Sequence, residues 1–180
     1  MKRISALWVC VGLFGYTLLP WYMIKRHFWD KLGPGMFSDP DAAPGLIQAL
    51  AFDRLWLAAP GLALAAAALT LLLRDPVRFG RWSAIAGFAG IFLTFAQGLA
   101  IGLHGPRLLP QIFGIGAMAQ GQNGFGVGAF LTLLGLLFVT TTGISATGKG
   151  RGDAFVTGLI GLIIALVAIF VFYPVLHILV

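Results

Sequence analysis

The stretch FGVGAFLTLLGLLFVTTTGISA, residues 125–146, decides the fold class of this chain. It contains no charged residue, and a second apolar run, 154–180, follows it after the short connection 147–153. A helix needs roughly 20 mainly apolar residues to cross the hydrocarbon core of a bilayer. Apolar residues surround both predicted helices on all sides, which is typical of membrane spans and not of helices in soluble bundles.

Working outward, three further runs of similar length precede these two, at 4–24, 54–73 and 83–103. The sequence therefore predicts an all-α fold, a polytopic transmembrane helix bundle of about five spans, with an interfacial turn at 46–52. The first run follows Lys2 and Arg3, as in a signal peptide. However, an aromatic edge at 18–22 replaces the small-residue cleavage site, which favours an uncleaved span.

The composition agrees with a lipid environment. Hydrophobic residues make up 59% of the chain and charged residues 10%, whereas a soluble domain carries about 25% charged residues. The net charge of +6 could suggest nucleic-acid binding. Its basic residues lie in short clusters between apolar runs rather than along one face, so we predict a lipid bilayer and no nucleic acid as partner. The lone Cys10 excludes a disulfide framework.

The connections predict the orientation, because Lys and Arg are retained on the cytoplasmic side. With the N-terminus inside, the inner segments, including a short basic connection at 74–82, carry seven such residues: Lys2, Arg3, Arg74, Arg78, Arg81, Lys149 and Arg151. The outer segments carry five: Lys25, Arg26, Lys31, Arg54 and Arg107. We therefore expect the N-terminus inside and the C-terminus outside.

Small residues four positions apart are the candidates for helix packing. The pairs are Gly98 with Gly102, Gly124 with Gly128, and Gly61 with Ala65. Such pairs let helix backbones approach closely in lipid. They indicate either packing inside the bundle, which we favour, or a docking face for another membrane domain. Gln97 is the most deeply placed polar side chain of the third span, and we expect it to bond a neighbouring helix.

Three other features could carry chemistry. The glycine series from Gly114 to Gly128 lacks the spacing of a phosphate-binding loop and reads as a loop entering a helix. The histidines, His27, His104 and His177, could ligate a metal, but they lie on three separate elements. We expect them to be interfacial or loop residues, and we predict no metal site and no cofactor.

The pair Asp53 and Arg54 heads the second span. It could be a functional intramembrane pair. We favour a boundary pair in which Arg54 extends to the lipid headgroups. No nucleophile and base can be paired elsewhere, so the sequence predicts no enzyme.

The motifs GFGVGA (124–129), RGDAFV (151–156) and FYPVL (172–176), with LPWY (19–22) and FW (28–29), give the chain a resemblance. Together they resemble the N-terminal region of ferric-iron-type ABC importer permeases, inner-membrane components of binding-protein-dependent transport systems. The resemblance implies an accessory membrane region of four spans, 1–153, and the first helix of a permease core, 154–180.

In such a system, substrate from a periplasmic substrate-binding protein crosses the bacterial inner membrane by alternating access, and a separate ATP-binding subunit hydrolyses ATP. The family couples to that subunit through a cytoplasmic Glu-Ala-Ala loop, yet this chain has no glutamate. The resemblance therefore implies that the coupling loop lies beyond Val180 and that the chain is a fragment. The alternative is a stand-alone polytopic scaffold or assembly protein without transport activity.

Overall fold

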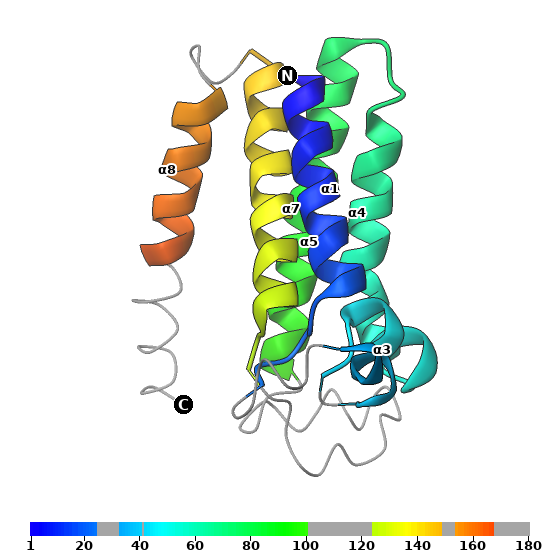
Figure 1. Cartoon of the computed structure of the whole chain (residues 1–180). Coiled ribbons are helices and arrows are strands. Elements are labelled where there is room, and N and C mark those ends of the chain that lie inside the picture. Colours follow the sequence, from blue (N-terminus) through cyan, green and yellow to red (C-terminus); the bar gives the residue numbers. More distant parts are fainter. Residues whose placement is uncertain (25–32, 41, 101–123, 149–153, 168–180) are drawn as a thin grey trace.

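The computed structural model describes residues 1–24, 33–40, 42–100, 124–148 and 154–167, and this part of the chain is all-helical, without a β-strand (Figure 1). Its α-helices are α1 Lys2–Leu18, α3 Gly45–Ala51, α4 Ala58–Thr70, α5 Pro76–Ala100, α7 Val127–Ala146 and α8 Ala154–Val167, with 3-10 turns η1 Pro34–Ser38 and η2 Leu55–Leu57. Two helical stretches, Pro76–Gln97 and Val127–Ala146, are long and apolar enough to cross a membrane. The prediction of an all-helical fold is confirmed.

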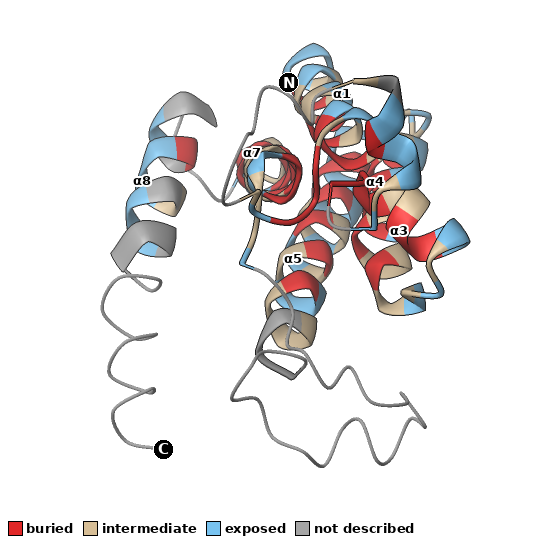
Figure 2. Cartoon of the chain, turned by 60° about the horizontal axis from the view of Figure 1, so that its bottom comes forward, coloured by how far each residue is buried: buried red, intermediate tan, exposed pale blue. Residues whose placement is uncertain are grey.

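Helix α7 lies at the centre of the described bundle. Helices α1, α5 and α8 pack along it, and α4 packs against both α5 and α1. In Figure 2, a view with the end opposite the N-terminus turned forward, much of α7 is coloured as buried, and 11 of its 20 residues are buried. Helices α1, α4, α5 and α7 therefore form one bundle, whereas α8 stands against α7 from outside (Figure 1).

The first predicted helix, 4–24, was placed too far along the chain. Helix α1 begins at Lys2 and ends at Leu18, and Leu19 is already extended, with φ −114° and ψ 151°. Pro20 explains this end, because its ring disfavours a helical conformation in the residue before it. The aromatic edge at 18–22 is therefore a helix end followed by an extended segment.

That extended segment is tied to two distant parts of the chain. The amide of Trp21 donates to the Ala43 carbonyl at 3.2 Å, and the amide of Met23 donates to the Gly124 carbonyl at 2.7 Å. In return, the amide of Gly126 donates to the Trp21 carbonyl at 2.8 Å. These bonds satisfy backbone groups that have left a helix, as a buried chain requires. They close the end of the bundle opposite the N-terminus, which we call the base.

Helix α5 begins earlier than the predicted span 83–103, so the predicted connection 74–82 was wrong. The helix starts at Pro76, directly after Asp75. Asp75 caps it: its Oδ1 accepts from the amide of Val77 at 3.1 Å and its carbonyl accepts from the amide of Phe79 at 2.9 Å. Proline suits the first helical position because its missing N–H would have no partner there. Arg78 and Arg81 of that connection consequently lie on the first turns of a helix, and Arg74 precedes it.

The second predicted span, 54–73, is shorter as a regular helix. It begins with the 3-10 turn η2 and continues as α4, which ends at Thr70. The predicted interfacial turn at 46–52 forms the short helix α3 in the base. Between α3 and η2 the chain reverses at Asp53, whose φ of 54° lies in the left-handed region.

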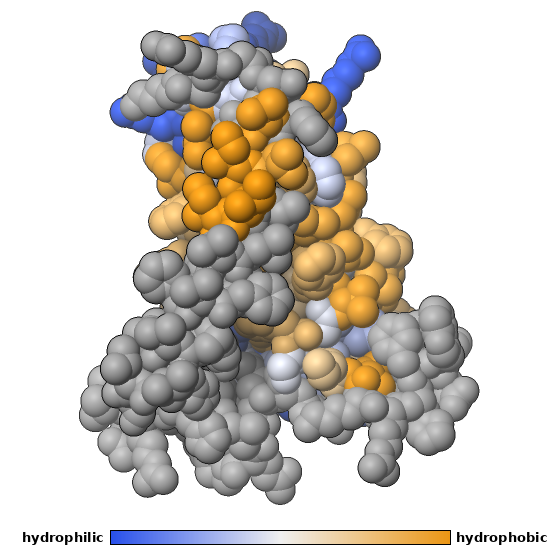
Figure 3. Space-filling model, turned by 90° about the vertical axis from the view of Figure 1, so that its left-hand side faces the viewer, coloured by the Kyte–Doolittle hydropathy of each residue, from blue (hydrophilic) through white to orange (hydrophobic). Residues whose placement is uncertain are grey.

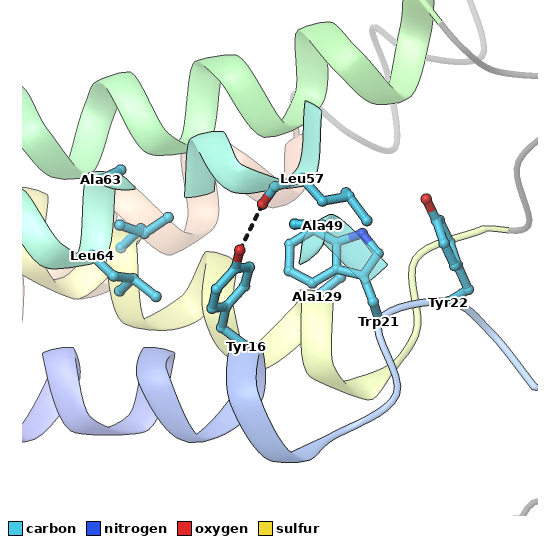
Figure 4. Close-up of a cluster of buried hydrophobic side chains, with 9 residues drawn as sticks. Tyr16, Trp21, Tyr22, Ala49, Leu57, Ala63, Leu64 and Ala129 are labelled. Atoms are coloured by element: carbon cyan, nitrogen blue, oxygen red, sulfur yellow. Dashed lines mark hydrogen bonds between the residues drawn. The ribbon is translucent and has the colours of Figure 1, made fainter. Parts of the chain in front are cut away.

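An aromatic cluster fills the bundle just above the base (Figure 4). Trp21 is fully buried, and its ring meets that of Tyr16 edge-on with centroids 5.8 Å apart. The hydroxyl of Tyr16 donates to the Leu57 carbonyl at 2.9 Å, which joins α1 to the start of α4. Phe125, before α7, meets Trp21 at 6.5 Å. The cluster therefore holds three chain segments together.

We predict that Tyr16→Phe lowers the free energy of unfolding by about 1 kcal/mol, the usual net value of one buried hydrogen bond. The measurement is unfolding of the purified protein in detergent, followed by tryptophan fluorescence. Phe14→Leu, at a half-exposed position of the same helix, is the control and should change stability less. Equal stability of Tyr16→Phe and the natural protein would contradict the bond's role.

Candidate functional site

The strongest structural feature of the described residues is a set of glycines where helix backbones touch. We call it the glycine seam and define it as Gly12, Gly15, Gly80, Gly87, Gly128, Gly135 and Gly143. Each member is buried. A methyl group built on any of them would lie under 3.0 Å from an atom of a neighbouring segment, closer than two non-bonded carbon atoms sit at their optimal separation.

On the α1 side, the seam brings two backbones into direct contact. A methyl group on Gly135 would lie 2.8 Å from the Cα of Gly12 and 2.6 Å from the Trp8 carbonyl oxygen. One on Gly128 would lie 2.5 Å from the Leu19 carbonyl oxygen and 2.7 Å from that of Gly15. Backbone atoms cannot turn away as side chains can, so this contact requires glycine.

The α5 side repeats the arrangement. A methyl group on Gly143 would lie 2.7 Å from the Gly80 carbonyl oxygen and 2.6 Å from the amide nitrogen of Ala84. One on Gly87 would lie 2.3 Å from the Thr140 hydroxyl oxygen. Helix α7 thus approaches α1 and α5 along two of its sides through the same kind of residue.

The interior of the bundle is also rich in hydroxyl groups. The buried hydroxyl side chains are Ser5, Thr70, Ser83, Thr94, Thr132, Thr140, Thr141, Thr142 and Ser145. Two of their bonds cross between helices: Thr70 shares a 2.6 Å bond with Ser83, and Thr132 donates to the Gly12 carbonyl at 3.3 Å. Others, such as Thr140 to Leu136 at 2.8 Å, bond back to their own helix. These bonds serve packing and do not activate a nucleophile.

The outward faces of the same helices carry large apolar side chains. Exposure reaches 70% at Leu62 on α4, 63% at Phe88 on α5 and 61% at Phe130 on α7. Figure 3, which looks at the α8 side, shows hydrophobic atoms over the middle of the described surface and hydrophilic atoms gathered at the end where the N-terminus lies. The interior is apolar too, with hydroxyl groups among its buried hydrophobic residues, so the unusual feature is an exterior that carries so many large apolar side chains.

Helix α8 contacts α7 through two glycines. Gly158 lies against the Phe138 ring, and Gly161 lies against the Thr141 methyl group. The other described face of α8 is apolar and exposed, with 45–63% exposure at Leu159, Ile160, Ile163 and Ile164. These four side chains of α8 are therefore not covered by the described bundle.

The base holds a buried amide and an arginine. Gln48 is fully buried; its Nε2 donates to the Pro40 carbonyl at 2.6 Å, and its Oε1 accepts from Arg54 Nη1 at 2.7 Å. The Arg54 guanidinium also lies 5.1 Å from the ring centre of Tyr22, a cation–π contact. Arg54 thus joins α3 to the Pro20–Tyr22 segment, and its predicted place at the lipid headgroups stays a prediction.

The predicted packing residues have different positions. Gly128 lies in the seam, whereas Gly124 is exposed and a methyl group there would meet nothing within 4 Å. Gly98 lies in the last turn of α5, and Gly102 lies outside the described residues. Gly61 packs on the Tyr16 ring, but Ala65 is exposed. Gln97 is part-buried near the end of α5.

The histidines considered as metal ligands, His27, His104 and His177, all lie outside the described residues. Within the described ranges, no three His, Cys, Asp or Glu side chains gather as a metal site would require. Most of the glycine series 114–128 lies outside the description as well, and its described members, from Gly124, lead into α7.

Six seam glycines were not predicted, because none of them has another glycine four positions away. The seam residues of α7, Gly128, Gly135 and Gly143, are seven and eight positions apart, or about two helical turns. Gly80 and Gly87 on α5 repeat the spacing of seven. Pairs of glycines seven or eight positions apart would have indicated five of the seven seam positions.

Compared with protein-family models, curated proteins and solved structures, the chain shows no match.

We predict different effects on stability for Gly124 and Gly128, which form one predicted packing pair in the sequence. Gly128→Ala should lower the free energy of unfolding by about 1–3 kcal/mol, the usual cost of overpacking, because its methyl group meets backbone carbonyls. Gly124→Ala should leave it nearly unchanged, since the added methyl meets open space. Unfolding in detergent, followed by circular dichroism, measures both. Equal effects of the two substitutions would show that the seam is less tight than described.

Proposed function

We propose that this chain is a multi-pass protein of the bacterial inner membrane. The observation that carries the proposal is the apolar exterior of the described bundle: many large leucine, isoleucine and phenylalanine side chains are exposed, while glycines and hydroxyl groups pack inside among buried apolar residues. In water such a surface would drive aggregation. In lipid it costs nothing, and close packing at small residues supplies the contact between helices.

The proposed topology has five spans, with the N-terminus inside and the C-terminus outside. Charge at the two ends of the described bundle supports this orientation. The end with the N-terminus carries five basic side chains, Lys2, Arg3, Arg74, Arg78 and Arg81, against Asp75. Among its described residues, the base carries Arg54 against Asp39 and Asp53. The more basic end belongs on the cytoplasmic side.

Lys2 contributes to that end in a second way. Its ammonium group donates to the Leu73 carbonyl after α4 and lies 5.8 Å from the ring centre of Phe79. A cation stabilises the free carbonyls at the C-terminal end of a helix. Lys2 therefore links the start of α1 to the end of α4 and to α5 at the proposed cytoplasmic end.

Within this membrane protein we propose two parts, 1–153 and 154–180. The packing supports the division, because α1, α4, α5 and α7 cover one another while α8 packs chiefly on α7. The apolar face that α8 leaves exposed has the character expected of a helix with further membrane neighbours. That is the position the first helix of a permease core would hold.

The activity proposed is that of a membrane component of a binding-protein-dependent ABC importer, for ferric iron. It rests on the resemblance of the motifs at 124–129, 151–156 and 172–176 to such permeases. Residues 1–153 would act as an accessory region beside the pathway, which further spans would line. Transport would require the separate ATP-binding subunit and the periplasmic substrate-binding protein.

The orientation can be tested with single cysteines in a Cys10→Ser background. Ser38→Cys lies in the base and Val77→Cys on the first turn of α5, and both positions are exposed. We expect an impermeant maleimide to label Ser38→Cys in intact cells and Val77→Cys after the inner membrane is opened. The reverse pattern would overturn the orientation, and equal labelling in intact cells would overturn the membrane-spanning fold.

The importer proposal can be tested separately in the native host. The tagged chain, extracted in mild detergent, should co-purify with an ATP-binding subunit identified by mass spectrometry. Cells lacking the chain should lose uptake of radiolabelled ferric iron and regain it on complementation. Normal iron uptake without the chain, and no ATPase in the purified sample, would favour the scaffold function instead.

A further inference from the structure

Helix α5 carries a continuous apolar stripe on its outward face. Trp82, Ile85, Phe88 and Phe92 follow one another at intervals of three or four residues, which keeps side chains on one face of a helix. Their exposed fractions lie between 49% and 63%. The opposite face carries the seam glycines and the buried hydroxyls, so the stripe takes no part in packing the described bundle.

Two arginines stand at the head of this stripe. Arg78 and Arg81 lie on the first two turns of α5, on the same face as Trp82 and Ile85. Arg78 pairs with Asp75 at 3.6 Å, yet its side chain stays 79% exposed. An exposed pair of this kind contributes little. Both guanidinium groups can therefore bind a further partner.

The charge around these arginines is strongly unbalanced. Arg3 and Arg74 lie at the same end and are exposed, and Asp75 is the acid among the described residues there. Arginines near the start of a helix also face the positive end of its dipole, which is unfavourable. A bound anion would offset both the mutual repulsion and the dipole. The complementary partner is thus negative at one end and apolar along the rest.

We propose that the stripe binds an anionic glycerophospholipid. The phosphate would lie between Arg78 and Arg81, and the acyl chains would run along Ile85, Phe88 and Phe92. The planar guanidinium group matches phosphate oxygens in pairs, and tryptophan favours the headgroup level that Trp82 would occupy. This inference rests on the proposed insertion in the membrane, with the N-terminal end at the inner leaflet.

A lipid fits the stripe better than a protein helix does. A protein partner in the bilayer would need small residues to approach α5 closely, but large aromatic side chains stand out here. Acyl chains adapt to such a surface. The inner leaflet also carries a negative surface potential that attracts basic residues.

The test uses the full chain purified in a neutral detergent. Thermal unfolding is measured with increasing dioleoylphosphatidylglycerol or, as the neutral comparison, dioleoylphosphatidylcholine. We expect the anionic lipid to raise the unfolding temperature at lower concentration. The double variant Arg78→Gln/Arg81→Gln should bind it about 30-fold more weakly, from the usual contribution of a basic residue near an anionic surface.

The matched control is Arg3→Gln, which removes the same charge at the same end but from α1. It should weaken binding less than Arg81→Gln does. Equal weakening would overturn the α5 site in favour of general attraction to the basic end. Soluble glycerophosphoglycerol should not stabilise the chain; if it does, the acyl stripe plays no part and the proposal fails.

Failure of this inference differs from failure of the membrane proposal. Each variant is also tested for resistance to extraction from membranes by alkaline carbonate. If the chain resists extraction but responds equally to both lipids, the lipid-site proposal is contradicted and the membrane proposal is not. A natural chain released by carbonate overturns the proposed function itself.

Discussion

The contact between the backbone of α7 and the backbones of α1 and α5 is the one on which the rest of the bundle depends. At Gly135 and Gly143 no side chain separates the helices, and backbone atoms meet at van der Waals distance. Helices this close have room inside for glycine, alanine, serine and threonine. Larger buried side chains, such as Leu64, Leu136 and the aromatic cluster around Trp21, pack beside these contacts, and many other large apolar side chains lie on the exterior.

The fold class was readable from the sequence because it depends on composition over long stretches. Apolar runs of about 20 residues predict helices whatever their neighbours are. The helix ends were less accurate, and local chemistry explains why. The apolar pattern of the sequence does not change at Leu18, so it does not show that Pro20 ends α1 there. Asp75 followed by Pro76 is a signal for the start of a helix. It was overlooked because residues 74–82 were interpreted as a connection on account of their charges.

The functional surface was harder to predict. A pair of glycines four apart is a known signal, yet the helix pairs described here meet at intervals of about two turns, so Gly128 was found and Gly135 and Gly143 were missed. Arg54 shows a different limit. Its position depends on Gln48 and on the Pro40 carbonyl, which the fold brings together. No local sequence pattern around Arg54 predicts these partners.

The extended segment Leu19–Met23 also sets an order of events during synthesis. Its backbone partners come from both sides of the chain's middle: Ala43 follows soon, but Gly124 and Gly126 emerge about a hundred residues later. Until then the Trp21 carbonyl and the Met23 amide must bond to water. The segment therefore cannot complete its backbone hydrogen bonds until the residues just before α7 have been made.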